Sequence, residues 1–183
     1  MKKLSVRERI IETASRLFYY EGYNQTGINQ IIEEAGVAKS SMYQSFRSKE
    51  DIAVAYLQQR HFNWMGALSD FVSTRPSNKD KVLACFDFMA KWLKQDGYRG
   101  CGFQNIITDL PAEQGKIRDQ TALHKNEVHK WIYSLLSEEN YDDAAALAEE
   151  VMVLMEGAII LSQIQHNAWP IKAAQRACTK LLA

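Results

Sequence analysis

Residues 26–52 read TGINQIIEEAGVAKSSMYQSFRSKEDI, and this stretch decides the fold. It predicts a short helix, a sharp Ala-Gly-Val turn at 35–37 and a second short helix that ends near Phe46, with a further helix starting at Ser48. Two short helices joined by a tight glycine turn form a helix-turn-helix, whose second helix fits the major groove of DNA. The stretch therefore predicts a DNA-binding protein, in which the remaining residues determine when it binds.

The second helix of this motif, at 39–47, presents two different faces at about 100° per residue. Met42 and Phe46 are apolar and four residues apart, so they are expected to anchor the helix to the rest of the domain. The opposite face carries Ser40 and Gln44, and Gln44 is the best candidate for base readout because an amide pairs bidentately with adenine. The candidate DNA-contacting residues are Thr26, Lys39, Ser40, Ser41, Tyr43, Gln44, Ser45, Arg47 and Lys49.

A polar surface helix in a three-helix subdomain is the competing interpretation of these residues. The combined spacing favours DNA reading, and the stretch resembles the amino-terminal domain of the TetR family of transcriptional repressors. The matching residues are Gly22-Tyr23, Thr26, Ile28, Ile31, Ala35-Gly36-Val37, Lys39, Tyr43, Phe46 and Ser48-Lys49-Glu50. The chain departs from the family pattern at Gly27, at Ser40 and at Ala38, where a capping serine is usual. The resemblance implies a three-helix DNA-binding domain, a helical ligand-binding domain, a homodimer, and a small effector that releases the operator.

Apolar residues recur mainly at three- and four-residue spacing along the 183 residues, which include only three prolines and nine glycines. That period predicts an all-α protein, with a three-helix helix-turn-helix DNA-binding domain at 1–48 and a larger helical ligand-binding and dimerisation domain at 49–183. Capping residues and helix breakers mark the ends of the helices. The expected helices lie between Ser5 and Gly22 and at about 27–35, 39–46, 48–74, 77–95, within 100–111, and at 112–137, 140 or 142–166, and 171–183.

The net charge of the chain is zero, but residues 1–49 carry eight Lys or Arg and five Asp or Glu, a net charge of +3. A basic amino-terminal part on an acidic remainder fits a DNA-binding end. Cys85, Cys101 and Cys178 show no CxxC spacing, so a disulfide framework, a metal site and a cofactor are not expected. Because no signal peptide and no apolar run of about 18 residues is recognised, the sequence predicts a cytoplasmic protein outside the membrane.

The expected helix at 142–166 is apolar around more than half of its circumference, so it is expected to be buried on more than one side. One side is expected to pack on its own domain and another on a second copy of the chain. The last helix, at 171–183, also has one apolar side. These two helices predict a homodimer held by a four-helix bundle. A single central core helix in a monomer is the alternative.

Aromatic and polar side chains scattered through 49–183 are candidates for an effector pocket, because small-molecule sites are apolar with a few polar groups. They are His61, Trp64, Phe86, Cys101, Phe103, Asn105, Trp131 and Gln163. Each of these aromatic residues is also a good core residue.

The leading interpretation is a ligand-responsive transcriptional repressor that leaves its operator when a small molecule binds the second domain. A redox- or electrophile-responsive regulator that uses Cys101 is an alternative, although a buried inert thiol is the simpler reading of that residue. A helical small-molecule-binding protein or enzyme with an incidental helix-turn-helix is another, and a DNA-bound scaffold or activator without an effector is a third. No Ser/His/Asp set, metal-ligand spacing or phosphate loop supports catalysis, so no catalytic residue is expected.

Overall fold

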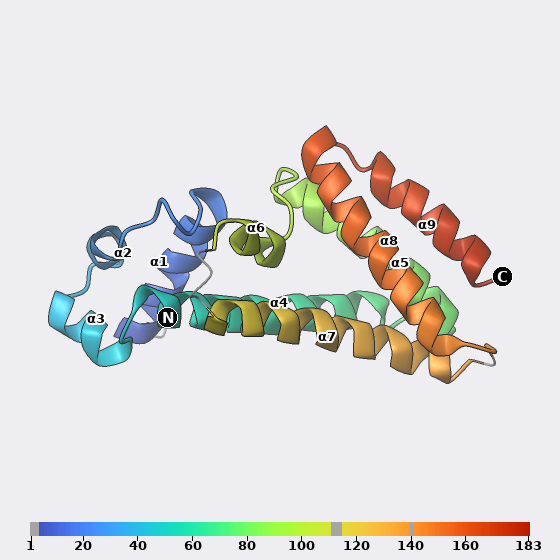
Figure 1. Cartoon of the computed structure of the whole chain (residues 1–183), viewed down its shortest axis with the longest axis horizontal. Helices are drawn as coiled ribbons and strands as arrows, with labels where there is room; N and C mark the ends of the chain where they lie inside the picture. Colours follow the sequence, from blue (N-terminus) through green and yellow to red (C-terminus); the bar gives the residue numbers. More distant parts are fainter. Residues whose placement is uncertain (1–3, 111–114, 140) are drawn as a thin grey trace. The chain divides into compact units, whose positions relative to one another are not determined.

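The computed structural model describes residues 4–110, 115–139 and 141–183, which form nine α-helices and no strand (Figure 1). The predicted all-α class is confirmed. The chain divides into two compact units: unit 1 comprises Met1–Phe62 and Gly102–Leu123, and unit 2 comprises Asn63–Cys101 and His124–Ala183.

The division falls inside two long helices, α4 (Lys49–Val72) and α7 (Gly115–Ser137). It therefore does not coincide with the predicted boundary after residue 48. The predicted boundary separates the residues that read DNA from the remaining residues. A division by compactness does not test it, so the boundary stays a prediction.

Unit 1 begins with α1 (Val6–Tyr20), α2 (Ile28–Glu34) and α3 (Lys39–Ser45). The predicted capping box starts α1: the Ser5 hydroxyl accepts from the Glu8 backbone N–H at 3.2 Å, and the Glu8 carboxylate accepts from the Ser5 N–H at 2.7 Å. The three helices share one core. Its fully buried side chains are Ile10, Ala14, Leu17, Ile31 and Met42.

Two further elements complete unit 1. The short helix α6 (Gly102–Thr108) packs against α1, and the Asn24 side-chain amide donates to the backbone carbonyl of Asp109 just beyond α6. Glycine is needed at the start of α6, because a Cβ atom on Gly102 would lie 2.5 Å from the Tyr56 hydroxyl oxygen of α4. The segment after α5 is therefore tied to the same unit as the helix-turn-helix.

Unit 2 contains α5 (Asn78–Gln95), α8 (Ala144–Gln165) and α9 (Trp169–Leu181), together with the later parts of α4 and α7. The predicted cap of α5 is present, since the Ser77 hydroxyl accepts from the Asp80 N–H at 3.0 Å. Helix α9 packs against both α5 and α8.

Some helix ends coincide with the predictions, as at Lys39, Gln95 and Ser137, and others differ by a few residues. Local capping explains two of these differences. Helix α8 begins at Ala144 because the Asp143 carboxylate accepts from the Ala146 N–H at 2.9 Å and so takes the cap position. Helix α9 begins at Trp169, two residues before the expected start, with Pro170 in its first turn. The expected helix residues 112–114 and Asn140 lie outside the described residues.

Candidate DNA-binding interface

Helix α3 is buried on one face and exposed on the other, as the sequence predicts. Met42 and Phe46 point into unit 1, with exposed fractions of 0% and 5%. The side chains of Lys39, Ser40, Tyr43, Gln44 and Arg47 are exposed, and those of Ser41 and Ser45 are partly buried. An exposed polar face on an apolar anchor is the arrangement that a helix needs to meet base edges and phosphates in a groove.

The turn before α3 is held in place by backbone geometry and by one arginine. Gly36 has a φ of +61°, a left-handed conformation that glycine adopts without strain. The Arg9 guanidinium of α1 donates to the Gly36 carbonyl at 3.1 Å. Ala38 occupies the cap position of α3 without a side-chain hydrogen bond, so the turn relies on Arg9 and on packing instead. Arg9 could not be recognised from the sequence, because only the fold brings it to residue 36.

Thr26 is a predicted contact that the structure places differently. Its side chain is fully buried, with an exposed fraction of 0%, and its hydroxyl donates to the Gly22 carbonyl at 2.8 Å. The hydroxyl closes the loop between α1 and α2 and faces the interior of unit 1. The hydroxyl is therefore not free to contact DNA, but the expected contact of Thr26 rests on the backbone N–H groups at the start of α2 and stays a prediction.

Ser45 and Lys49 are predicted DNA contacts whose side chains already interact with other groups of unit 1. The Ser45 hydroxyl donates to the Ser41 carbonyl at 3.0 Å, within α3. The Lys49 ammonium lies 4.2 Å from the centre of the Tyr23 ring, and burial lowers the pKa of Lys49. The ring thus holds this cation at the start of α4, in the same unit as α3.

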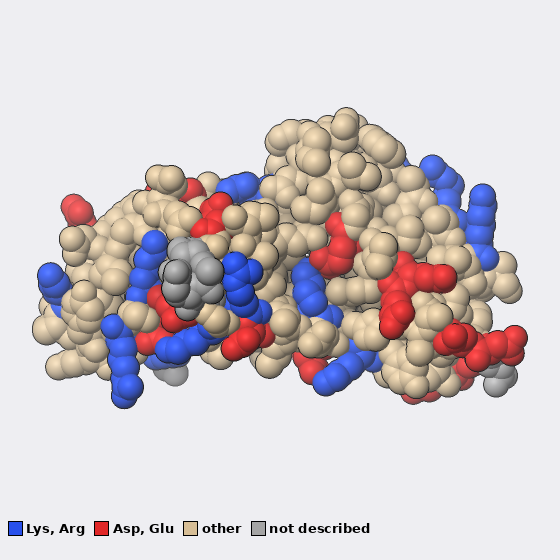
Figure 2. All heavy atoms as spheres, viewed as in Figure 1, with Lys and Arg blue, Asp and Glu red and all other residues tan. Residues whose placement is uncertain are grey.

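On the face drawn in Figure 2, Lys and Arg side chains stand out over α1–α3, with several carboxylates between them. One of the cations that the sequence analysis missed is Arg7, whose guanidinium carbon lies 5.1 Å from the centre of the Phe46 ring. Arg7 is exposed in the first turn of α1, beside the end of α3. The position of Arg7 in the first turn of α1, two residues after the capping residue Ser5, could have suggested an exposed cation. The sequence does not show that the start of α1 lies beside the end of α3.

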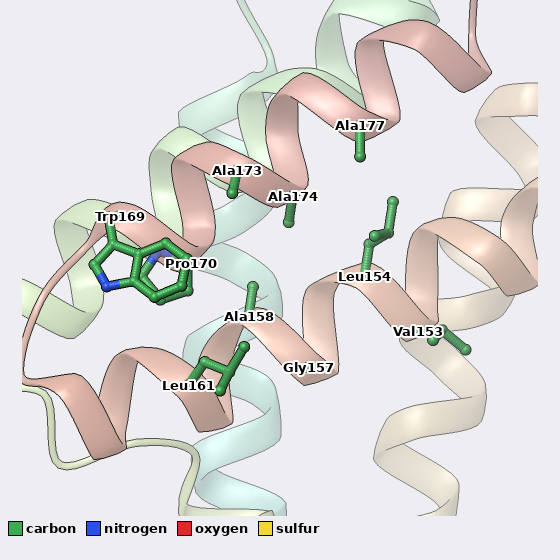
Figure 3. Close-up of a pocket in the computed structure, with 10 residues that line it drawn as sticks. All are labelled: Val153, Leu154, Gly157, Ala158, Leu161, Trp169, Pro170, Ala173, Ala174 and Ala177. Carbon is green, nitrogen blue, oxygen red and sulfur yellow. The ribbon is translucent and has the colours of Figure 1, made fainter.

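A second exposed surface lies on unit 2, between α8 and α9 (Figure 3). It is an apolar groove of about 330 Å³ that carries no ionisable side chain. Its lining residues are Val153, Leu154, Gly157, Ala158, Leu161, Trp169, Pro170, Ala173, Ala174 and Ala177. Several of the apolar groups are well exposed, including Val153 at 71% and Trp169 at 51%. Exposed apolar surface of this kind marks an interaction site.

Two family models match the chain, one over its amino-terminal part and one over most of the rest. The family of bacterial regulatory proteins named after tetR matches residues 10–56, which include the whole helix-turn-helix. The carboxy-terminal domain of LmrA/YxaF-like transcriptional regulators matches residues 79–177, more than half of the chain. The chain belongs to the TetR family of DNA-binding transcriptional regulators. The predicted resemblance is confirmed.

Similarity to individual transcriptional regulators includes one short, close match and longer, more distant ones. The uncharacterised regulator YxaF of Bacillus subtilis is 51% identical over 49 residues, which are 26% of each protein. The transcriptional repressor NemR of Escherichia coli is 24% identical over 181 residues, covering 92% of this chain and 89% of NemR. The crystal structure of reduced E. coli NemR superposes with a TM-score of 0.82 at 21% identity over 96% of both chains, which supports the shared fold.

The predicted effector-pocket residues of this TetR-family chain fall in both units. His61, Phe103 and Asn105 lie in unit 1, and the other five lie in unit 2: Trp64, Phe86, Cys101, Trp131 and Gln163. The Trp64 ring packs edge-on against the rings of Phe88 at 5.5 Å and His124 at 5.6 Å. The assignment of a pocket to these residues stays a prediction.

Two searches of the described residues bear on other functions. Residues 4–110, 115–139 and 141–183 contain no group of three or more His, Cys, Asp or Glu side chains placed to hold a metal ion. Within the same ranges, no helix combines the length and the apolar character that a membrane span requires. Neither search identifies a site that competes with the two exposed surfaces.

Proposed function

We propose that this chain is a ligand-responsive repressor that binds operator DNA as a homodimer and leaves it when a small molecule binds the carboxy-terminal domain. The observation that carries the proposal is the polar outer face of α3, anchored by Met42 and Phe46, in a chain of the TetR family. The proposed DNA contacts are Lys39, Ser40, Ser41, Tyr43, Gln44, Ser45, Arg47 and Lys49.

The groove between α8 and α9 supports the dimer. Val153, Gly157 and Leu161 follow one another at four-residue spacing along one side of α8, and a Cβ atom on Gly157 would meet nothing within 4 Å. A second copy of α8 and α9 would cover this apolar surface and complete a four-helix bundle. A symmetric dimer presents two copies of α3 to two half-sites, so the operator should be nearly palindromic.

Release by an effector follows from linkage. A small molecule that binds more tightly to a conformation with wrongly spaced α3 helices shifts the population toward that conformation and so lowers operator affinity. By linkage, bound operator lowers the affinity for the small molecule by the same factor. Repression is the proposed sign of regulation because a protein that occupies a promoter only without effector blocks transcription until the effector arrives.

Gel shifts with DNA flanking the chain's own gene test the proposal. We expect a retarded band at low salt with at least one neighbouring promoter and none with a shuffled fragment of equal length. The absence of a retarded band with every neighbouring promoter would refute DNA binding. A small-molecule screen by thermal shift then tests the effector. A true ligand should raise Tm in a dose-dependent way and should also abolish the retarded band.

A second candidate signal is covalent and rests on one cluster in unit 2. The Lys125 ammonium lies 3.7 Å from the Cys101 sulfur and 2.7 Å from a Glu156 carboxylate oxygen. Burial works to lower the pKa of Lys125, but its interactions with Cys101 and Glu156 outweigh burial and raise that pKa, so Lys125 stays cationic. A neighbouring cation stabilises a thiolate, the form that attacks electrophiles.

All three cysteines are buried. Burial raises the pKa of Cys178 to about 11 and raises the pKa of Cys85 further, so both thiols are kept neutral. If Cys101 is the sensor, its thiolate adds to the alkene carbon of N-ethylmaleimide and the adjacent carbon takes a proton. Mass spectrometry should then find the adduct on Cys101 first, and Cys101→Ala should abolish operator release by the reagent. Release that persists in Cys101→Ala would eliminate this candidate.

A further inference from the structure

Unit 1 contains a cleft of about 410 Å³ beside the end of α3. The start of α1, the end of α3, the first turns of α4 and the start of α7 contribute to its lining. The lining residues are Arg7, Ser45, Phe46, Arg47, Asp51, Val54, Ala55, Gln58 and Lys116. The ionisable side chains among them carry three positive charges and one negative charge, so the cleft favours an anion.

Two of these cations are available to a ligand. Arg7 and Arg47 are both exposed, and no carboxylate within the described ranges forms an ion pair with either of them. The Phe46 ring, 5.1 Å from the Arg7 guanidinium, holds Arg7 at the end of α3. A guanidinium group presents paired N–H donors that match the oxygens of a phosphate.

The third cation, Lys116, is committed to the acidic start of α4. Its ammonium lies 2.7 Å from an Asp51 carboxylate oxygen, and its backbone N–H donates to the Glu50 carboxylate at 3.2 Å. The hydrogen bond from Lys116 lowers the pKa of Asp51, so this carboxylate is charged. Lys116 therefore neutralises an acidic edge that would otherwise repel an anion in the cleft.

We propose that this cleft binds a phosphate of the operator backbone, held by Arg7 and Arg47, and that Lys116 makes the approach possible by neutralising Asp51. The proposal rests on the DNA-binding function proposed above. Two observations select a DNA phosphate as the occupant: the charge of the cleft, and its continuity with the reading surface, since Ser45 and Arg47 belong to both. Arg7 and Lys116 thereby join the DNA interface.

The position of Lys116 could link the Lys116–Asp51 pair to the control of DNA binding. Lys116 lies in the first turn of α7, a helix whose later part belongs to the second unit. The Lys116–Asp51 pair is exposed, with 63% and 23% of the two side chains accessible, so breaking it changes the folding free energy little. A displacement of the start of α7 would leave the Asp51 carboxylate unpaired beside the phosphate and weaken DNA binding without unfolding either unit.

The test measures Kd for a labelled operator and for an unrelated duplex by fluorescence anisotropy, from roughly 50 to roughly 300 mM KCl. Arg7→Gln should weaken binding to both duplexes by a similar factor, about fivefold to tenfold, because a phosphate contact carries no sequence information. It should also reduce the slope of log K against log salt by about 0.9 per subunit, roughly 1.8 for a dimer. Arg7→Lys keeps the charge, so the slope should be retained.

Lys116→Gln tests the neutralising role through a rescue. It should weaken DNA binding about threefold to fivefold, and the double variant Lys116→Gln with Asp51→Asn should restore most of the loss, because the uncompensated carboxylate is removed. Lys130→Gln is the matched control: Lys130 also lies on α7 and pairs with a carboxylate, Glu127, at 3.1 Å. This control should bind DNA within twofold of the wild type.

Each outcome is decisive once circular dichroism shows that the variants are folded. An unchanged salt slope in Arg7→Gln overturns the phosphate site, and a loss in Lys116→Gln that Asp51→Asn does not rescue overturns the neutralising role. A thermal shift with inorganic phosphate that requires Arg7, combined with an unchanged DNA salt slope, would mean a small-anion site instead. A wild-type protein that binds no duplex at any salt concentration would remove the proposed function itself, which distinguishes the two failures.

Discussion

The outer face of α3 and the groove between α8 and α9 are both exposed in the single chain, but their chemistry is opposite. The outer face of α3 carries hydroxyl, amide and cationic groups over an apolar anchor, whereas the groove on unit 2 is lined by alkyl groups and one indole ring. The first surface can exchange its water for base edges and phosphates, and the second gains free energy only against another apolar surface. The two surfaces therefore predict different partners, DNA for α3 and a second copy of the chain for α8 and α9.

The largest effect is expected from charged substitutions in the groove between α8 and α9. Val153→Glu combined with Leu161→Glu places two charges on side chains that are 71% and 45% exposed in the single chain, so folding should persist while dimerisation is lost. Without the dimer the two half-sites are bound independently, and operator affinity should fall by about 100-fold or more. Light scattering coupled to size exclusion and anisotropy measure the two losses on the same sample.

Two comparisons sharpen this result. Tyr133→Glu, on α7 outside the groove and 44% exposed, should leave both the dimer and the affinity unchanged. Gly157→Leu adds a side chain where the single chain has open space, so it should fold at least as well and yet weaken the dimer by blocking close helix approach. A fully dimeric Gly157→Leu variant would show that α8 does not form the subunit contact.

The anchor of α3 is expected to give the next largest effect. Met42→Ala removes a fully buried side chain from the core that α3 shares with α1 and α2, and should reduce the free energy of unfolding by roughly 2–5 kcal/mol. Urea titration followed by circular dichroism measures the change. An effect below about 1 kcal/mol would mean that α3 is held by something other than its apolar face.

Gln44 tests the outer face of the same helix. Gln44→Ala should leave the free energy of unfolding unchanged within about 0.5 kcal/mol, because the side chain is exposed. Binding to the preferred operator should weaken by about 1–3 kcal/mol, and discrimination should relax at a single base-pair position in each half-site. Binding to a set of operators with single substitutions checks this, and Gln95→Ala, an exposed glutamine of α5, is the control. Equal weakening on every sequence would assign Gln44 to the DNA backbone.

The features that sequence could predict are those set by neighbours along the chain. The caps at Ser5 and Ser77 and the left-handed Gly36 mark helix ends through bonds or conformations that span a few residues. The orientation of α3 follows from the four-residue spacing of Met42 and Phe46, which any helix converts into one buried face.

The features that sequence missed depend on residues distant in the chain. Arg9 reaches the turn at Gly36 and Lys116 reaches Asp51, and both contacts exist only once the helices are packed. The orientation of the Thr26 side chain was missed for the same reason, since a polar residue before a helix looks exposed until its hydroxyl is seen to bond Gly22. Aromatic residues give still less guidance, because Phe86 fills a core as readily as it would line a cavity.

The smallest expected effect is a pH dependence that distinguishes the cleft beside α3 from the groove between α8 and α9. Lys116 lowers the pKa of Asp51, so this carboxylate contributes stability above its unfolded pKa of about 3.9 and loses that contribution as the pH falls through the lower folded value. The difference in unfolding free energy between the wild type and Asp51→Asn should therefore shrink between roughly pH 5 and pH 3. Because the pair is exposed, the difference should stay below about 1 kcal/mol. The groove between α8 and α9 has no ionisable lining group, so Asp51→Asn should not change the dimer dissociation constant at any pH in this range. A dimer that weakens specifically in Asp51→Asn would mean that the two surfaces are not independent.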